Sequence, residues 1–266
     1  MTLVVDTFTS MAEADAARTA DSRFMAGGTL VMRDVNYADQ QFTRVVRVAQ
    51  APRSISRESE RLVIDAGVTM ADIIASPDAA FLAPVARAVG GPAIRNMATV
   101  GGNLFAPYPY GDFATALLAL DSEVRLVDNR TQPLDQFFAS RDNSPLVTSV
   151  AVQIPRENEF RFRKMSRLKP KGISVVSVAG WLPGASSRIS GARIAFGVMG
   201  PTPLRATAAE SALEGIYPDE HSIKPALSSA TNGLTPQDDS LASAWYRSEI
   251  APVLLKRLLL GEEASV

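Results

Sequence analysis

Two short loops, each built on a pair of glycines, constrain this chain most strongly. The first is Ala26-Gly27-Gly28-Thr29 and the second is Thr99-Val100-Gly101-Gly102-Asn103, and each follows an apolar, strand-like stretch. A glycine pair permits positive φ angles and lets the backbone come close to a ligand. Consecutive backbone N–H groups in such a turn form a nest for an anionic oxygen. The pattern predicts that the two loops together hold a pyrophosphate.

The alternative interpretation is that each glycine pair simply makes a turn, which is the commoner use of such a pair. Neither loop matches the G-x-G-x-x-G or the G-x-x-x-x-G-K-[ST] pattern, so neither Rossmann nor P-loop nucleotide binding is indicated. The side chains of Thr29, Thr99 and Asn103 add neutral hydrogen-bonding groups to the two loops.

The composition excludes much of the chemistry that a protein can perform alone. The 266 residues include no cysteine and one histidine, His221. Disulfides, thiolate nucleophiles, cysteine-held zinc and iron–sulfur clusters are therefore excluded, and two-histidine zinc motifs are too. A net charge of −1 argues against nucleic-acid binding. We expect a chain that either binds passively or takes its chemistry from a cofactor.

The chain carries no pattern of a leader or a membrane span. No basic segment precedes an apolar one near the N-terminus, where the first positive side chain is Arg18. The apolar run Phe113–Leu120 is far shorter than the roughly 20 residues of a membrane helix. We therefore expect a cytoplasmic protein with no membrane span.

Hydrophobic periodicity and cap residues predict a mixed α+β chain. Strands are expected at residues 4–9, 45–48, 61–68, 123–127 and 147–154, and helices at 10–20, 70–75, 81–89 and 113–120, with a polar linker at 51–60. In the last third, strands are expected at 160–165, 173–181 and 192–198, and helices at 205–213, 222–230 and 240–260. Trp245 and Tyr246 stand at helical spacing with Ile250 and Val253, which favours a place in the core.

The order and spacing of several segments resemble one known family. Phe24–Leu30, Ala98–Leu104 and Gly111-Asp112 are followed by the string Gly200-Pro201-Thr202-Pro203-Leu204-Arg205-Ala206 and by Ala244-Trp245-Tyr246-Arg247. Over nearly its whole length the chain resembles the FAD-binding (medium) subunit of the molybdenum hydroxylases. This is the carbon monoxide dehydrogenase, xanthine dehydrogenase and nicotine dehydrogenase type.

The resemblance implies an α+β FAD-binding fold of the vanillyl-alcohol oxidase (PCMH) type. Two subdomains, residues 1–57 and 58–158, would hold FAD between them. Residues 159–266 would form the family's C-terminal domain, a three-stranded sheet with helices.

The resemblance also implies which residues bind FAD, and it implies no catalytic residue and no metal site in this chain. Gly111 and Asp112 would approach the ribityl or adenosine part, and Lys164 would lie near the flavin, where its charge would raise the flavin potential. Tyr108 and Tyr110 would either stack on the flavin or pack within their loop. The residues expected to line the pyrophosphate are Met25, Ala26, Gly27, Gly28, Thr29 and Leu30 in the first loop and Ala98, Thr99, Gly101, Gly102 and Asn103 in the second.

The implied function is electron transfer within a larger complex. A large molybdopterin subunit and a small [2Fe-2S] subunit would be the partners, arranged as a dimer of heterotrimers, and they alone would carry those cofactors. FAD would be bound noncovalently, since no cysteine is present and His221 is far in sequence from the loops. The alternatives are a standalone flavoprotein oxidoreductase of the same fold and a flavin-free scaffold subunit. The substrate and the terminal acceptor stay open.

Overall fold

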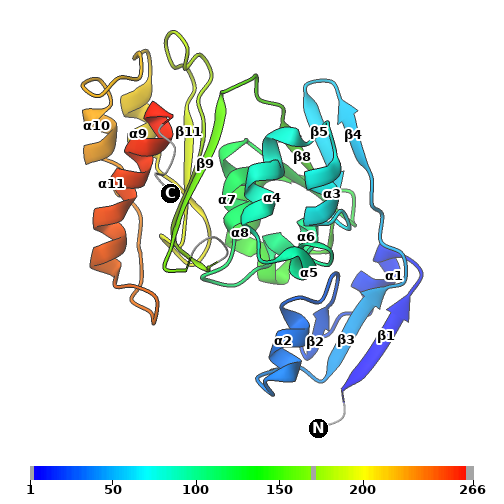
Figure 1. Cartoon of the computed structure of the whole chain (residues 1–266). Helices are drawn as coiled ribbons and strands as arrows, with labels where there is room; N and C mark the ends of the chain where they lie inside the picture. Colours follow the sequence, from blue (N-terminus) through cyan, green and yellow to red (C-terminus); the bar gives the residue numbers. More distant parts are fainter. Residues whose placement is uncertain (1–2, 169–171, 262–266) are drawn as a thin grey trace. The chain divides into compact units, whose positions relative to one another are not determined.

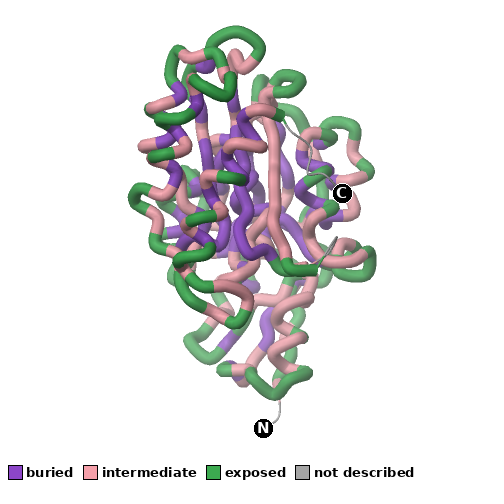
Figure 2. Tube along the Cα trace, turned by 60° about the vertical axis from the view of Figure 1, so that its left-hand side comes forward, coloured by how far each residue is buried: buried purple, intermediate pink, exposed green. Residues whose placement is uncertain are grey.

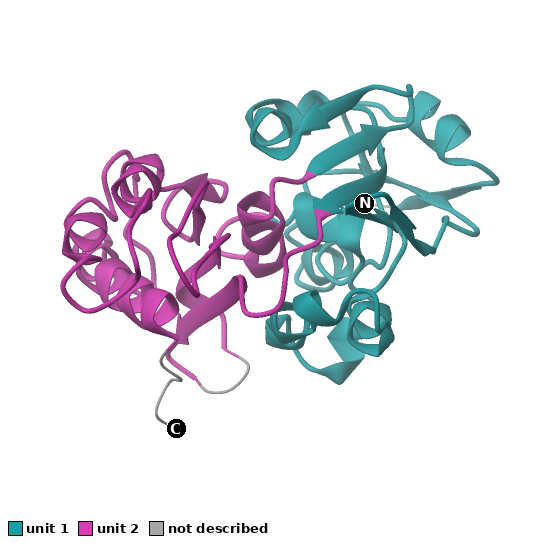
Figure 3. Ribbon diagram, turned by 90° about the horizontal axis from the view of Figure 1, so that it is seen from above, with its two compact units in different colours: residues 1–106, 123–152 teal, residues 107–122, 153–266 magenta. Residues whose placement is uncertain are grey.

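The computed structural model describes residues 3–168 and 172–261, and the chain forms two compact units. Unit 1 consists of residues 1–106 and 123–152, and unit 2 consists of residues 107–122 and 153–266 (Figure 3). Each unit combines strands and helices (Figure 1), which confirms the predicted α+β class. The expected subdomain 58–158 is shared between the units, because residues 107–122 belong to unit 2.

Unit 1 begins with a small parallel sheet in the order β1-β3-β2. Its strands are β1 (Val4–Phe8), β2 (Ser22–Phe24) and β3 (Arg44–Val48). The helix α1 (Met11–Ala16) follows β1, and α2 (Val31–Asn36) follows β2. A capping box starts α1, as the sequence predicts, because the Ser10 hydroxyl accepts from the Glu13 N–H and the Glu13 carboxylate accepts from the Ser10 N–H. Since the strands are parallel, their carboxyl ends lie at one edge of the sheet.

The rest of unit 1 is a five-stranded sheet with short helices. The strand order is β4 (Ile55–Glu58), β5 (Arg61–Asp65), β8 (Val147–Gln153), β6 (Glu123–Leu126) and β7 (Thr131–Pro133). The helical segments are α3 (Met70–Ala75), η1 (Ala80–Leu82), α4 (Ala83–Ala88), α5 (Pro92–Arg95), α6 (Val100–Leu104), α8 (Leu134–Ser140) and η2 (Arg141–Asn143). The expectation of a linker at 51–60 is wrong in part, because β4 pairs antiparallel with β5 and this polar segment forms a sheet edge.

Unit 2 is an antiparallel sheet with helices. The strand order is β12 (Leu204–Arg205), β11 (Arg193–Gly197), β10 (Ser174–Trp181) and β9 (Phe160–Ser166), and the helices are α7 (Asp112–Ala119), α9 (Thr207–Leu213), α10 (Lys224–Ser228) and α11 (Ala244–Leu260). The sheet has four strands rather than the predicted three, because β12 is too short to leave a periodic pattern. Figure 1 shows α7 and α11 on opposite sides of this sheet. In Figure 2 the exposed residues gather at the turns and the buried ones inside.

The long helix α11 corrects one expectation. Trp245 and Tyr246 are 69% and 39% exposed, so neither belongs to the core. Successive residues of an α-helix are about 100° apart, so Trp245 lies about 200° from Arg247 around the axis. The buried stripe follows the 3.6-residue period from Arg247, and it contains Arg247, Ala251, Leu254, Leu255, Leu258 and Leu259.

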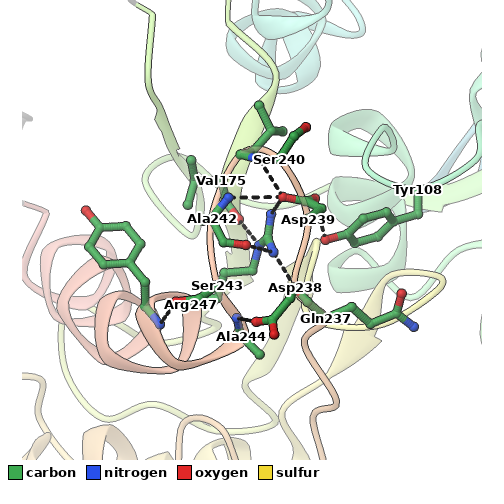
Figure 4. A network of polar contacts seen from close by, with 12 residues as sticks. Tyr108, Val175, Gln237, Asp238, Asp239, Ser240, Ala242, Ser243, Ala244 and Arg247 are labelled. Carbon is green, nitrogen blue, oxygen red and sulfur yellow. Dashed lines mark hydrogen bonds and ion pairs between the residues drawn. The ribbon is translucent and has the colours of Figure 1, made fainter.

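Arg247 is the fully buried cation of α11 (Figure 4). Its Nε donates to the carbonyl of Val175 at 3.0 Å, and its Nη1 donates to the carbonyl of Ala242 at 2.8 Å and to that of Gln237. Its Nη2 forms an ion pair with Asp239 at 2.8 Å. One guanidinium therefore ties β10, the segment before α11 and α11 itself together, and its charge is balanced.

The same network holds the segment that precedes α7. The Tyr108 hydroxyl donates to the second carboxylate oxygen of Asp239 at 2.8 Å, and the Arg247 guanidinium lies 5.8 Å from the centre of the tyrosine ring. Burial raises the pKa of Asp239, but hydrogen bonds from Arg247 and Tyr108 outweigh it and lower that pKa to about 2. Burial, with the hydrogen bond to Asp239, raises the pKa of Tyr108 to about 12. Both groups therefore keep one protonation state at neutral pH.

Replacing Arg247 should destabilise unit 2 strongly. Arg247→Met removes the cationic partner of Asp239 and the guanidinium hydrogen bonds to three backbone carbonyls, and such a loss costs about 3–5 kcal/mol. Urea unfolding followed by circular dichroism measures the change. Arg156→Met is the control, because Arg156 is exposed and its loss should change stability by less than about 0.5 kcal/mol. Equal stability of the two variants would contradict a structural role for the network.

Candidate functional site

The first glycine loop, residues 25–30, leaves the carboxyl edge of the parallel sheet. It connects β2 to α2, and Gly28 has a φ of +73°. Ligands of sheets with parallel strands bind at this edge, outside the carboxyl ends of the strands. The positive φ at Gly28 turns the backbone in the manner of an anion-binding nest. The residues from Gly27 to Leu30 are partly exposed, so a ligand can reach them.

Backbone donors are unused throughout this loop. Within the described residues, none of the N–H groups from 26 to 30 donates a hydrogen bond, whereas Met25 just before them donates to the carbonyl of Val46 at 2.8 Å. The N–H of Met32, two residues after them, donates to the carbonyl of Gly28 at 2.9 Å. Backbone N–H groups that a ligand or neighbour shields from water need a hydrogen-bond acceptor. Five consecutive unpaired donors around a positive φ therefore form a site that an anion fits.

Gly27 brings the two predicted loops together. A Cβ atom built on Gly27 would lie 1.6 Å from the carbonyl oxygen of Met97 and 2.5 Å from the Met97 carbonyl carbon. No side chain can occupy such a position, so the first loop packs backbone against backbone on the segment just before Ala98. The structure thus places the two loops side by side within unit 1, as their joint use requires.

The second loop differs from the expectation, because its glycine pair lies inside the short helix α6. The Thr99 hydroxyl caps this helix and accepts from the N–H of Gly102 at 3.0 Å. The carbonyl of Thr99 accepts from the Asn103 N–H at 3.0 Å and from the Asn103 side-chain amide at 2.8 Å. The polar groups of Thr99 and Asn103 therefore bond to each other in this structure.

The first two N–H groups of α6 are also used. The Val100 N–H donates to the carbonyl of Val68 at 2.8 Å, and the Gly101 N–H donates to the carbonyl of Ala66 at 2.9 Å. A Cβ atom on Gly101 would lie 2.8 Å from that of Ala66, so this glycine serves close packing. The expected nest of free N–H groups is therefore present in the first loop and absent from the described second loop, which supports the first one instead.

The last three predicted residues form a separate cluster in unit 2. The Lys164 ammonium lies 2.8 Å from Asp112, and their side chains are only 12% and 11% exposed. The Ser174 hydroxyl donates to the other oxygen of Asp112 at 2.6 Å. Gly111, with a φ of +133°, precedes Asp112 at the start of α7. The charge of Lys164 is thus largely balanced by a neighbour.

Sequence reasoning missed several residues at these two places. Nothing in the sequence marks Ser174 as a partner of Asp112, since a serine at the start of a strand is common. Met32 lies just beyond the first loop and Met97 lies just before the second, and their side chains are 39% and 54% exposed. Tyr108 and Tyr110 both line a small pocket with Gly111 and with residues 197, 198 and 200–203. The Tyr108 hydroxyl also donates to Asp239.

Other kinds of site are not found in the described part of the chain. There, no group of three or more His, Asp or Glu side chains is placed to hold a metal ion. His221 is exposed. No helix in residues 3–168 and 172–261 is both long and apolar enough to span a membrane.

Comparisons with known proteins agree with this geometry. Residues 3–157 match the family described as the FAD binding domain in molybdopterin dehydrogenase, and residues 160–261 match the CO dehydrogenase flavoprotein C-terminal domain. The chain is 24% identical over 255 residues to the carbon monoxide dehydrogenase medium chain of Hydrogenophaga pseudoflava, covering 90% of this chain and 88% of that one. It is 28% identical over 257 residues to the nicotine 6-hydroxylase medium subunit of Paenarthrobacter nicotinovorans, covering 90% and 89%.

A solved structure shares the fold over nearly the whole chain. It is the carbon monoxide dehydrogenase from Hydrogenophaga pseudoflava that lacks the Mo-pyranopterin moiety of its molybdenum cofactor, with a TM-score of 0.88 and 25% identity. The match covers 97% of this chain and 96% of that one. Together with the two domain matches, this shows that the chain belongs to the family of FAD-binding flavoprotein subunits of the molybdopterin dehydrogenases.

Proposed function

We propose that this chain is the electron-transfer subunit of a heteromeric molybdenum hydroxylase and that it binds FAD noncovalently. When bound, FAD supplies the redox chemistry that links a [2Fe-2S] cluster of a partner subunit to an external electron acceptor. The observation that carries this proposal is the run of five unpaired N–H groups at residues 26–30. Such a run fits the pyrophosphate of a dinucleotide.

The two loops have different tasks in this proposal. The first loop donates hydrogen bonds from its backbone to the pyrophosphate oxygens and offsets their charge. The second loop, built from Ala98, Thr99, Gly101, Gly102 and Asn103, keeps the first loop in place through the contact between Gly27 and Met97. Because its own donors are already bonded, this support stays rigid before any ligand arrives.

The cluster in unit 2 adjusts the electrostatics near the flavin. Gly111 and Asp112 approach the ribityl or adenosine part, and Lys164 lies beside the flavin ring. Since Lys164 is paired with Asp112, it contributes a dipole rather than a full positive charge. This changes the simple expectation that Lys164 alone raises the flavin potential.

The partners follow from the same proposal. We infer a large molybdopterin subunit and a small [2Fe-2S] subunit, assembled as a dimer of heterotrimers in the cytoplasm. The names of the relatives support this inference, since they are a medium chain, a medium subunit and a subunit of the 6-hydroxypseudooxynicotine dehydrogenase complex. Noncovalent binding is supported by the absence of cysteine.

Purification from the native host tests the proposal. We expect a yellow-brown complex that contains a large and a small partner and releases its FAD on acid precipitation. A yellow monomer that is active alone would instead support a standalone oxidoreductase. A colourless protein would support a flavin-free scaffold, and flavin that stays with the polypeptide would contradict noncovalent binding.

Gly27→Ala should weaken FAD binding roughly tenfold or more, because the new Cβ has to push the first loop away from Met97 and several charge-assisted hydrogen bonds are lost. Gly91→Ala is the matched control, since a Cβ at Gly91 meets no atom within 4 Å. Fluorescence titration of the FAD-free chain measures both affinities. Equal affinities would show that the contact of the two loops does not shape the site.

Charge changes in the unit 2 cluster should move the FAD midpoint potential in opposite directions. Lys164→Met leaves the negative Asp112 and should lower the potential, whereas Asp112→Asn leaves the positive Lys164 and should raise it. The double variant should return close to the wild-type value. Spectroelectrochemical titration measures all three, and Lys256→Met, from an exposed ion pair, is the control. Shifts of the same sign would exclude an electrostatic role near the flavin.

A further inference from the structure

The inner strand β10 of unit 2 carries a bulge where its pairing with β9 begins. Ser174 pairs with Ser166 and Val176 pairs with Met165, so Val175 has no partner on β9. From Val176 onward the two strands pair without interruption. An extra residue of this kind bends the strand and changes the direction of the side chains beside it. The bulge therefore decides which side of the sheet Ser174 faces.

The bulge turns Ser174 toward α7. In a regular strand Ser174 and Val176 would lie on the same face, because side chains alternate between the two faces. Val175 and Val176 both belong to the core cluster that contains the buried apolar residues of α11. Ser174 instead donates a hydrogen bond at 2.6 Å to Asp112, the first residue of α7. Since α7 and α11 lie on opposite sides of the sheet (Figure 1), the bulge sets the direction of Ser174.

Arg247 holds the residue that the bulge inserts. Its Nε donates to the carbonyl of Val175 at 3.0 Å (Figure 4). A bulged residue leaves the hydrogen-bond ladder of the strands, so its carbonyl needs another donor when it is buried. Val175 is 2% exposed, and the guanidinium supplies that donor. The buried network around Arg247 is thus attached to the residue next to Ser174.

The Asp112 carboxylate is held from two strands at once. One oxygen accepts from the Ser174 hydroxyl on β10 at 2.6 Å, and the other lies 2.8 Å from the Lys164 ammonium on β9. All three side chains are largely buried, and Ser174 is only 2% exposed. A carboxylate that accepts through both oxygens cannot turn without losing one of the two bonds. The Ser174 hydroxyl therefore fixes the orientation in which Asp112 faces Lys164.

We propose that Ser174 is a positioning residue for the Asp112–Lys164 pair and that the bulge, held by Arg247, directs it toward α7. The inference rests on the proposed function, because Lys164 acts on the flavin only if FAD is bound nearby. Without the Ser174 hydroxyl, one oxygen of Asp112 loses its donor in a largely buried place, and the carboxylate turns toward water. The charge of Lys164 is then less balanced, which should raise the flavin potential.

The midpoint potential of bound FAD tests this inference. Ser174→Ala should raise the potential, in the same direction as Asp112→Asn and by a smaller amount. Ser174→Thr keeps the hydroxyl and should give a potential close to that of the wild type. In an Asp112→Ala background, Ser174→Ala should cause no further shift, because the acceptor is gone.

Ser177→Ala is the matched control. Ser177 is a buried serine of the same strand and pairs directly opposite Lys164. Among the described residues its hydroxyl has no hydrogen-bond partner, so its removal should leave the potential unchanged. Thermal melts should show that every variant is folded at the temperature of the measurement.

Urea unfolding of the FAD-free chain tests the same contact without the cofactor. A double-mutant cycle with Asp112→Asn and Lys164→Met measures the coupling of the pair. This coupling should fall by roughly half or more in a Ser174→Ala background, since the orientation of Asp112 is then no longer fixed. Ser177→Ala should leave the coupling as it is.

The outcomes separate the inference from the proposed function. A wild-type potential in Ser174→Ala, or an unchanged coupling in urea, would overturn the positioning role and leave the proposed function intact. A shift that persists in the Asp112→Ala background would also overturn it, because the effect would not pass through the carboxylate. A wild-type chain that binds no FAD would overturn the proposed function, and a weakened coupling in urea would still support the orientation of Asp112 by Ser174.

Discussion

The candidate site depends on one contact between two stretches of backbone. Gly27 lies so close to the carbonyl of Met97 that no other residue type fits between them. This contact joins a loop of the small parallel sheet to a segment that precedes α6, more than 60 residues further along the chain. The loop can leave its N–H groups unpaired because its position is fixed from outside, by a neighbour whose own hydrogen bonds are complete.

In unit 2 a segment is also held in position by its neighbours, here through ion pairs and hydrogen bonds to carboxylates. The segment from Tyr108 to Asp112 is held at both ends by carboxylates that have cationic partners. At one end Asp239 accepts from Tyr108 and from the buried Arg247, and at the other Asp112 is paired with Lys164. Burial of these charges is tolerable only because each carboxylate receives more than one hydrogen bond. The turn at Gly111 therefore has a defined conformation before α7 begins.

Local signals predicted the elements that depend on local chemistry. The capping box at Ser10 and Glu13 starts α1 as expected, and the continuous apolar run 113–120 is the buried helix α7 within one residue. Elements that depend on distant partners were missed. The glycine pair at 101–102 lies in a helix because Ala66 and Val68 accept from its first turn, and those residues are over 30 positions away.

In the candidate site, too, features set by the local sequence could be predicted and features set by distant partners could not. The sequence indicates which glycines matter but not which of the two loops keeps free donors, since that depends on the partners of each N–H group. Arg247 gives no sign of burial in the sequence, because only the carbonyls around it make a buried cation stable. The exposure of Trp245 and Tyr246 follows from the phase of α11, which the position of Arg247 sets.

A binding site made of main-chain donors places few demands on side-chain identity. Ala26, Thr29 and Leu30 can each be exchanged for any residue except proline without loss of a backbone N–H group, provided that the two glycines stay. The hydrogen bonds that bind the ligand then depend on the conformation of the backbone. Its affinity is altered separately, by the surrounding side chains. Such a site can persist while the rest of the chain diverges, in keeping with relatives that share about a quarter of its residues and nearly its whole fold.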